Sequence, residues 1–301
     1  MEKLKKFFIN GTWVNPRSDE TMAVISPSDL RQIGTVSLGN EQDVNDAVQS
    51  AKKAFTSFSK TKKKERIDLL KGLKRITERR FEDLAQAMRE EMGAPISMAR
   101  SAQADAAVGH LESFIGALAE LKERTVLDSG AILLKEPVGI CGLITPWNWP
   151  VNQIALKVIP ALATGCTCIL KPSEYTPLSA MVYTEIIEEA GYPAGVFNLV
   201  NGVGDTVGRA MSKHSEIDMM SFTGSTRAGR LISKNASDTI RRVCLELGGK
   251  GGNIVFADSY PNAVRDGIRN VMSNSGQSCD APTRMLVEKS IYQRAIREAS
   301  E

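Results

Sequence analysis

The amino-acid sequence predicts an α/β fold: a doubly wound parallel sheet, followed by the start of a second α/β domain. Between residues 138 and 247, short apolar runs alternate with stretches of helical periodicity, and glycine or polar loops separate them. Strands and helices that alternate at these lengths indicate right-handed crossovers between parallel strands. The 301 residues are enough for two domains, since one domain takes roughly 100 to 200 residues.

The composition is typical of a soluble globular protein. Hydrophobic residues make up 42% of the chain, charged residues 24%, and the net charge is +3. This balance argues against disorder. It also provides no broad basic field, so we expect neither nucleic acid nor a membrane surface as the main partner. The densest basic run, residues 60–66, is interpreted as the exposed start of a helix.

The cysteines and histidines indicate the compartment and exclude a metal site. Five cysteines stand at positions 141, 166, 168, 244 and 279, an odd number in mostly apolar segments. We therefore expect reduced thiols in a cytoplasmic protein. Cys166 and Cys168 are interpreted as core residues on one face of a strand. With His110 and His214 as the two histidines, no metal-ligand spacing can be assembled, so no metal is predicted.

No targeting or membrane segment is predicted. The N-terminal residues become polar too early for a signal peptide. The most apolar region, residues 138–170, is interrupted by polar residues and prolines, so it does not resemble a membrane span.

The first 135 residues predict an edge of short strands followed by helices. Residues 1–40 alternate apolar runs with turn signals such as Asn10-Gly11, which is typical of small hairpins. Helical periodicity then predicts helices over 41–58, 63–92 and 96–122, with Gly93 ending the second. Residues 125–135 form a strand-like interruption around Ser129-Gly130.

The regular part of the chain supplies the sheet. Strands are predicted at 138–144, 166–170, 196–200, 219–222 and 242–247, and helices at 152–162, 177–190, 205–211 and 225–233. Ligands on such sheets bind beyond the carboxyl ends of the strands. The loops that follow the strands are therefore the candidate site.

The first such loop is Thr-Pro-Trp-Asn-Trp-Pro at 145–150. Prolines and indoles could hold the amide of Asn148 rigidly, and an amide so held can donate a hydrogen bond to a developing oxyanion. The alternative is that Asn148 only closes a turn while Trp147 and Trp149 fill the core.

The second loop is Lys-Pro-Ser-Glu at 171–174. Lys171 and Glu174 could both reach the hydroxyls of a ribose, and the carboxylate would repel a 2′-phosphate, so NAD is favoured over NADP. The alternative is an ordinary start of a helix.

The third loop is Phe-Thr-Gly-Ser-Thr at 222–226. Gly224 and Ser225 come just before a predicted helix, whose free N–H groups and dipole could hold a pyrophosphate. The spacing of Gly224 and Gly229 does not match the dinucleotide fingerprint G-x-G-x-x-G.

Two further motifs suit covalent acyl chemistry. Gly-Gln-Ser-Cys at 276–279 places Cys279 among small and polar residues, and Leu-Glu-Leu-Gly-Gly-Lys at 245–250 places Glu246 near a strand end. A thiolate can attack a carbonyl, and a carboxylate can activate the water that releases the acyl group.

These five motifs, in this order and at these spacings, resemble the aldehyde dehydrogenase superfamily. The resemblance implies oxidation of a small aldehyde to a carboxylic acid with NAD as cofactor. It makes Cys279 the nucleophile, Asn148 and the N–H of Cys279 the oxyanion hole, and Glu246 the general base. The resemblance also assigns residues to the cofactor: Lys171 and Glu174 at the ribose, Ser225 with Gly224 at the pyrophosphate, Trp147 as a wall, Gly202 near the adenine, and Gly248.

The resemblance also implies a domain organisation. Residues 1–122 and 138–248 would form the Rossmann-like dinucleotide-binding domain, 123–137 an oligomerisation arm, and 249–301 an incomplete catalytic domain carrying the nucleophile. The Glu-Ile-Phe-Gly-Pro segment of full-length relatives is not found, so we expect the N-terminal portion of a longer enzyme that is a homo-oligomer when complete.

Two alternatives remain open at this stage. The chain could be a non-catalytic nucleotide-binding or oligomerisation module of such an enzyme. It could also catalyse acyl reduction or coenzyme A-dependent acyl release, in which water is not the acceptor.

Overall fold

The computed structural model describes residues 2–301, which divide into two compact units. The first unit contains the chain up to Thr223 together with Arg227–Leu245, and the second contains Gly224–Thr226 and Glu246–Glu301. No described helix combines the length and the apolar character that crossing a bilayer requires.

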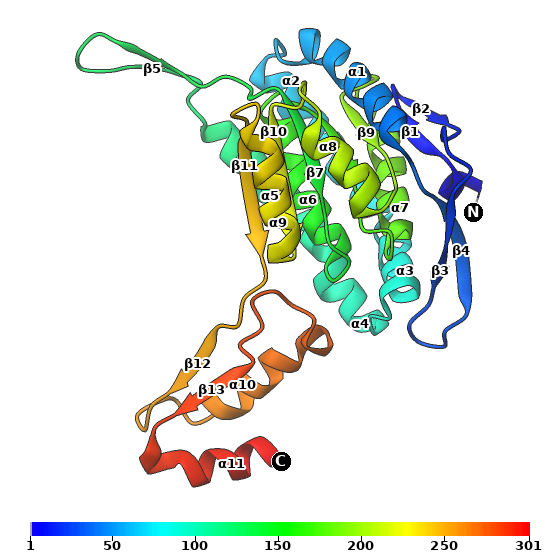
Figure 1. The fold of residues 1–301 in the computed structure, drawn as a ribbon. Helices are drawn as coiled ribbons and strands as arrows, with labels where there is room; N and C mark the ends of the chain where they lie inside the picture. Colours follow the sequence, from blue (N-terminus) through cyan, green and yellow to red (C-terminus); the bar gives the residue numbers. More distant parts are fainter. Residues whose placement is uncertain (1) are drawn as a thin grey trace. The chain divides into compact units, whose positions relative to one another are not determined.

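A seven-stranded sheet in the order β11-β10-β7-β8-β9-β1-β2 organises the fold (Figure 1). Its successive strands from the regular part of the chain are β7 (Ile140–Ile144), β8 (Thr167–Lys171), β9 (Phe197–Leu199), β10 (Met219–Gly224) and β11 (Arg242–Leu247). β7 runs parallel to both β8 and β10, and β8 runs parallel to β9. The predicted doubly wound α/β fold is confirmed.

The N-terminal residues add an antiparallel hairpin to this sheet. β1 (Phe7–Ile9) pairs with β2 (Thr12–Val14) on one side and with β9 on the other, both antiparallel. Asn10 and Gly11 between them have φ of 55° and 73°, the left-handed conformations that a tight hairpin turn requires. A second hairpin, β3 (Thr21–Ile25) with β4 (Gln32–Ser37), forms its own two-stranded sheet. The predicted edge hairpins are thus confirmed, and they make the sheet mixed.

The helices before the hairpin arm agree with the prediction except at one break. α1 (Glu41–Phe58) begins at a capping box formed by Asn40 and Asp43. The helix predicted over 63–92 is wrong as a single element, because it breaks at Arg80 into α2 (Lys63–Arg79) and α3 (Phe81–Met92). The main partner of α2 is α5, whereas α3 packs on α7 and on the turn at residues 99–104; α2 also contacts α7. α3 ends as expected at Gly93, whose φ is 74°.

The helical run over 96–120 contains an irregular turn. It consists of α4 (Ile96–Met98), a π-helical turn (Ala99–Ala104) and α5 (Asp105–Glu120). Strands β5 (Arg124–Val126) and β6 (Ile132–Leu134) then form a hairpin that extends away from the sheet (Figure 1).

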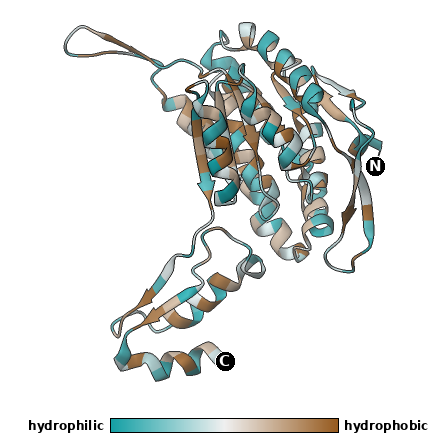
Figure 2. Ribbon diagram, viewed as in Figure 1, coloured by the Kyte–Doolittle hydropathy of each residue, from teal (hydrophilic) through white to brown (hydrophobic). Residues whose placement is uncertain are grey.

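The crossover helices cover the sheet. They are α6 (Pro150–Ala163), α7 (Pro177–Glu189), α8 (Arg209–Lys213), which follows a π-helical turn (Gly204–Gly208), and α9 (Thr226–Ser237). Every residue of β7 and β8 is buried, and apolar residues concentrate on these central strands (Figure 2). Cys166 and Cys168 both lie in the core, although Cys166 precedes β8 rather than belonging to it.

The second unit has its own small sheet. β12 (Gly252–Val255) and β13 (Arg284–Val287) pair in parallel, and α10 (Ala263–Met272) and α11 (Tyr292–Ser300) pack together beside them. Val255, Val264 and Ala295 form its core. Short 3-10 turns complete the chain at Glu2–Lys5, Ser273–Gly276 and Lys289–Ile291.

Candidate active site

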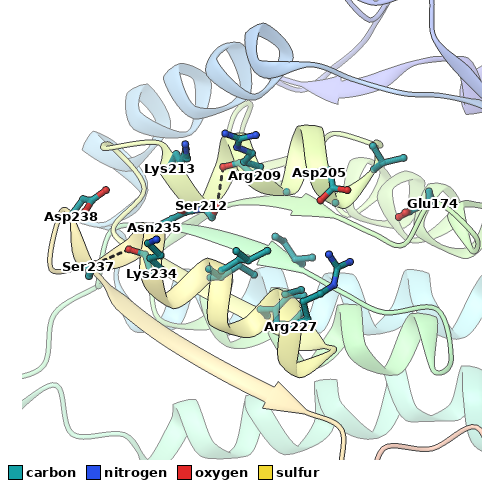
Figure 3. Close-up of a pocket in the computed structure, with 18 residues that line it drawn as sticks. Glu174, Asp205, Arg209, Ser212, Lys213, Arg227, Lys234, Asn235, Ser237 and Asp238 are labelled. Atoms are coloured by element: carbon teal, nitrogen blue, oxygen red, sulfur yellow. Dashed lines mark hydrogen bonds between the residues drawn. The ribbon is translucent and has the colours of Figure 1, made fainter.

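A cavity of about 750 Å³ lies in the first unit, between α8, α9 and the carboxyl ends of β7 and β10. Ile144 and Phe222 line it from the two strands, and Glu174 stands at one end (Figure 3). The helices contribute most of the polar lining: Asp205, Arg209, Ser212, Lys213, Arg227, Lys234, Asn235, Ser237 and Asp238. This position agrees with the rule that ligands of parallel sheets bind beyond the strand ends.

Lys171 is buried and holds two predicted site residues together. Its ammonium donates to the carbonyl of Pro172 at 2.8 Å, to Oε2 of Glu174 at 3.2 Å and to the carbonyl of Gly202 at 2.7 Å. An ammonium has three donors, so all of them are engaged. Burial lowers the pKa of Lys171, and the Glu174 carboxylate opposes that shift. The structure thus brings Lys171, Glu174 and Gly202 together, with Glu174 facing the cavity.

Gly202 is at a position where a side chain cannot fit. A Cβ there would lie 2.3 Å from Cγ2 of Val207 and 3.3 Å from the backbone nitrogen of Gly39. The chain after β9 therefore passes very close to the turn that leads into α8. This close approach shapes the cavity wall where Val203 and Gly204 line it.

Four cations line the cavity without a protein partner. Within residues 2–301 the side chains of Arg209, Lys213, Arg227 and Lys234 make no recorded hydrogen bond or ion pair. Sequence reasoning missed them. Helical spacing was the available signal, because Arg209 and Lys213 are four residues apart on α8 and Arg227 and Lys234 are seven apart on α9, so each pair shares a helix face.

A hydrogen bond joins the two helical walls. Nδ2 of Asn235 on α9 donates to Oγ of Ser212 on α8 at 2.8 Å, and that hydroxyl donates to the carbonyl of Arg209 at 2.9 Å. The residues present fit a dinucleotide: the volume is within the range of about 300 to 1,000 Å³ of ligand sites, and the unpartnered cations suit a phosphate-bearing ligand.

The loop after β7 places Trp147 and Asn148 in the first unit. Trp147 is 43% exposed, so the alternative that it fills the core is wrong, while Asn148 is half-buried. The carbonyl of Asn148 accepts a hydrogen bond from Nε2 of Gln103 at 3.3 Å, which fixes the backbone of this loop. Pro150 then begins α6.

Gly224 and Ser225 lie at the junction of a strand and a helix, as predicted. β10 ends at Gly224 and α9 begins at Thr226, so Ser225 directly precedes the helix. The first turn of any helix leaves backbone N–H groups without helical partners. Gly248 is exposed, and a Cβ there would meet no atom within 4 Å, so this position does not require glycine for space.

The second unit contains two of the three predicted catalytic residues, Glu246 and Cys279. Glu246 lies on β11, where it and Cys244 are exposed while Leu245 and Leu247 are half-buried. Cys279 is also exposed. The backbone N–H of Gly249 donates to the carbonyl of Cys279 at 3.3 Å, so the segments that carry the two residues are joined.

The backbone before Cys279 is strained. Asn274, Ser275 and Gly276 have φ of 54°, 57° and 72° in succession, which is uncommon for the first two residues. Nδ2 of buried Asn274 donates to the carbonyl of Gln277 at 3.2 Å and holds this loop. Such strain is frequent at functional sites, so it supports a functional role for the loop that ends at Cys279.

Comparison with known proteins identifies relatives of the chain. Residues 13–301 match the model of the aldehyde dehydrogenase family. The chain is 47% identical over 289 residues to 3-succinoylsemialdehyde-pyridine dehydrogenase of a Pseudomonas species, covering 95% of this chain and 60% of that protein.

Solved structures give the same result. The crystal structure of an aldehyde dehydrogenase from Bartonella henselae superimposes with a TM-score of 0.96 at 51% identity, covering 98% of this chain and 63% of that one. A mutant of aldehyde dehydrogenase C from Pseudomonas syringae, solved with NAD+ and octanal, superimposes with a TM-score of 0.97 at 43% identity. The match covers 99% of this chain and 61% of that one. The chain spans about 60% of the length of the curated relatives it matches.

Proposed function

Since the chain belongs to the aldehyde dehydrogenase family, we propose that it provides the cofactor cavity and the nucleophile of an NAD-dependent enzyme that oxidises a small aldehyde to a carboxylic acid. The observation that carries this proposal is the hydrogen bond from Gly249 to Cys279, because it joins the segment of an exposed thiol to the segment of Glu246. The activity belongs to the architecture of the complete relatives, of which this chain spans about 60%.

The chemistry proposed for the chain's own residues has three steps. The thiolate of Cys279 adds to the aldehyde carbon, and the amide of Asn148 with the N–H of Cys279 stabilises the negative charge on oxygen. Loss of hydride from this thiohemiacetal leaves a thioester on Cys279. Glu246 then accepts a proton from the water that hydrolyses the thioester.

We propose that the cavity of the first unit holds NAD, whose nicotinamide supplies the hydride acceptor when it is bound. Lys171 fixes Glu174 at the cavity, where its carboxylate can accept hydrogen bonds from ribose hydroxyls. Gly202 lies beside the adenine end, Gly224 and Ser225 provide the helix start for the pyrophosphate, and Trp147 forms a wall. For Gly248, the assignment to the cofactor site rests on the family resemblance alone.

Two alternatives give different results in one assay. The purified chain, incubated with an aldehyde and NAD, should form NADH that is abolished by Cys279→Ala if the chain is catalytic. The absence of any NADH formation that depends on Cys279 would favour the non-catalytic nucleotide-binding module. Glu246→Gln should accumulate the thioester; continued turnover with coenzyme A as acceptor would favour the acyl-transfer reading.

The β5–β6 hairpin, within residues 123–137, is proposed as an oligomerisation arm of the complete homo-oligomer. Val126, Ile132 and Leu134 are 58%, 52% and 57% exposed, which is unusual for such side chains on a free surface. Replacing Ile132 and Leu134 by serine should shift the assembly to smaller species in size-exclusion chromatography. The free cysteines support a cytoplasmic location.

A further inference from the structure

We propose that Cys166 is a site of oxidation by small peroxides, and that it then forms a reversible disulfide with Cys141. Cys141 is the second residue of β7 and Cys166 directly precedes β8, so both lie near the amino ends of these strands. The cavity proposed for the cofactor lies at the carboxyl ends. The inference therefore goes beyond the proposed function and concerns thiols that the aldehyde chemistry does not use.

Three buried cysteines lie on one face of the sheet. Cys141 is the direct partner of Cys168 in the parallel pairing of β7 and β8, and Cys166 stands two residues before Cys168. Residues two apart along a strand share a face. The hydroxyl of the intervening Thr167 donates to the carbonyl of Ala51 on α1 at 3.0 Å, so the cysteines face away from α1. All three belong to the same core cluster.

The sulfurs of Cys141 and Cys166 are in contact. The thiol of Cys141 donates a hydrogen bond to the sulfur of Cys166, and the backbone N–H groups of Val138 and Gly139 also bond to that sulfur. Gly139 and Cys166 directly precede the first pair of the ladder between β7 and β8. Because Gly139 has no side chain, nothing on this part of β7 separates the two sulfurs.

Within this cluster Cys166 is the thiol best suited to react. The hydrogen bond from Cys141 lowers the pKa of Cys166, and burial opposes that shift. Burial raises the pKa of Cys168, so that thiol stays protonated. The thiolate is the form that peroxides oxidise. Oxidation should therefore begin at Cys166 and spare Cys168.

Cys166 lies directly below the surface although its side chain is buried. Its exposed fraction is 2%, but Thr164 is exposed, and Oγ1 of Thr164 lies 3.5 Å from Sγ of Cys166. Thr164 directly follows α6, and its hydroxyl donates to the carbonyl of Pro160 at 2.8 Å. Helix ends open locally at little cost in free energy. A molecule as small as hydrogen peroxide can thus reach the sulfur where α6 ends.

The proposed reaction has two steps. The thiolate of Cys166 attacks one oxygen of the peroxide, the O–O bond breaks, and hydroxide leaves, so that Cys166 becomes a sulfenic acid. The sulfur of Cys141 then attacks the sulfur of Cys166; the S–O bond breaks, and the hydroxyl leaves as water with the proton of Cys141. The two thiols lose two electrons and two protons, and hydrogen peroxide is reduced to two molecules of water.

The test maps the disulfide by mass spectrometry and does not depend on turnover. It uses the full chain with Cys244→Ser/Cys279→Ser, which removes the two exposed cysteines. The folded protein is treated with hydrogen peroxide, alkylated and digested with trypsin, which releases Cys141 in residues 136–157 and Cys166 with Cys168 in residues 158–209. Peroxide should link these two peptides, and dithiothreitol should separate them. Adding Cys166→Ser should abolish the link, whereas the matched control Cys168→Ser should retain it.

Several outcomes would overturn the proposal: no link in the folded chain, a link that survives Cys166→Ser, loss of the link in Cys168→Ser, or equally fast linking in urea. Circular dichroism shows whether each variant folds. If Cys166→Ser does not fold, Cys141→Ala takes its place; Cys166 should still be oxidised while the peptide of residues 136–157 stays unlinked, and a Cys166 that remains a free thiol would contradict the proposal. The aldehyde-dependent NADH assay bears on the proposed function alone.

Discussion

The backbone N–H of Gly249 donates to the carbonyl oxygen of Cys279 across 3.3 Å. Gly249 lies three residues after Glu246 and two residues beyond the end of β11. Cys279 follows a loop in which three successive residues have positive φ. The hydrogen bond therefore limits how far the thiol-bearing loop can move from the strand that carries the carboxylate. A backbone hydrogen bond thus joins the two candidate catalytic segments.

Gly249→Pro should loosen the loop at Cys279, because proline has no N–H to donate. In a Cys244→Ser background, where Cys279 is the remaining exposed cysteine, we expect iodoacetamide to alkylate Cys279 faster in the proline variant. Loss of the hydrogen bond should also lower the stability of the second unit by about 1 kcal/mol. Gly249→Ala keeps the donor, and its Cβ would lie 3.7 Å from the Cys279 oxygen, an ordinary contact. Equal alkylation rates in the two variants would show that the bond does not restrain the loop.

Lys171→Met should weaken both the fold and the binding of NAD. The Lys171 side chain is 3% exposed, and its ammonium donates to Glu174 and to two carbonyls, which would all lose a donor. We expect the free energy of unfolding in urea to fall by about 2 kcal/mol. Lys213→Met removes an exposed lysine from the same cavity and should change stability by less than about 0.5 kcal/mol. A drop of the same size in both variants would contradict the role given to Lys171.

Glu91 of α3 caps a helix that lacks a cap of its own. Thr176 at the start of α7 makes no side-chain capping bond, and the carboxylate of Glu91 accepts from the N–H groups of Leu178 and, at 3.0 Å, Ser179. Glu91→Gln replaces one acceptor oxygen with a donor and leaves one buried N–H unsatisfied. We expect a loss of about 2 kcal/mol in the free energy of unfolding. Glu90→Gln, which removes a partly exposed pair with Arg31, should cost less than about 1 kcal/mol.

Glu91 should also make stability depend on pH. Burial raises the pKa of this carboxyl from its ordinary 4.5 to about 8, against the opposing effect of its hydrogen bonds to Ser179 and Leu178. The folded state therefore binds a proton that the unfolded state has already released between these pH values. The stabilisation is complete below pH 4.5 and is lost as the pH rises towards 8. Urea midpoints measured across this interval should fall for the unmodified chain more steeply than for Glu91→Gln; parallel curves would show that Glu91 does not titrate there.

The sheet was predictable from the sequence because each of its strands and crossover helices is specified by a pattern within its own short segment. The residues of β11 were predicted at 242–247 as found, and those of α1 at 41–58, since alternation and helical spacing are properties of short segments. The break at Arg80 was not predictable, because the apolar spacing continues through it, while the contacts of α2 and α3 with distant helices are not visible in the local sequence.

Residues of the candidate site were predictable only where they belong to a recognisable sequence motif. Cys279, Glu246 and the pair Lys171 and Glu174 stand in distinctive segments, and the structure places the latter two in one hydrogen-bonded group. The cations of α8 and α9 were missed because their chemistry depends on two helices separated by β10 forming facing walls. Helical spacing shows which residues share a face, but not what that face will meet.

Ile240 offers a stabilising substitution away from both candidate sites. It has φ of 52°, in the left-handed region, and its side chain is 94% exposed. A β-branched residue is strained in this conformation and gains nothing here from burial, whereas glycine adopts it freely. Ile240→Gly should therefore raise the free energy of unfolding by about 1 kcal/mol, since relief of strain exceeds the entropy that glycine adds to the unfolded chain. Ile240→Val keeps the branched Cβ and should leave the thermal midpoint unchanged. If the glycine variant melts at or below the temperature of the valine variant, the left-handed conformation at this turn is not a source of strain.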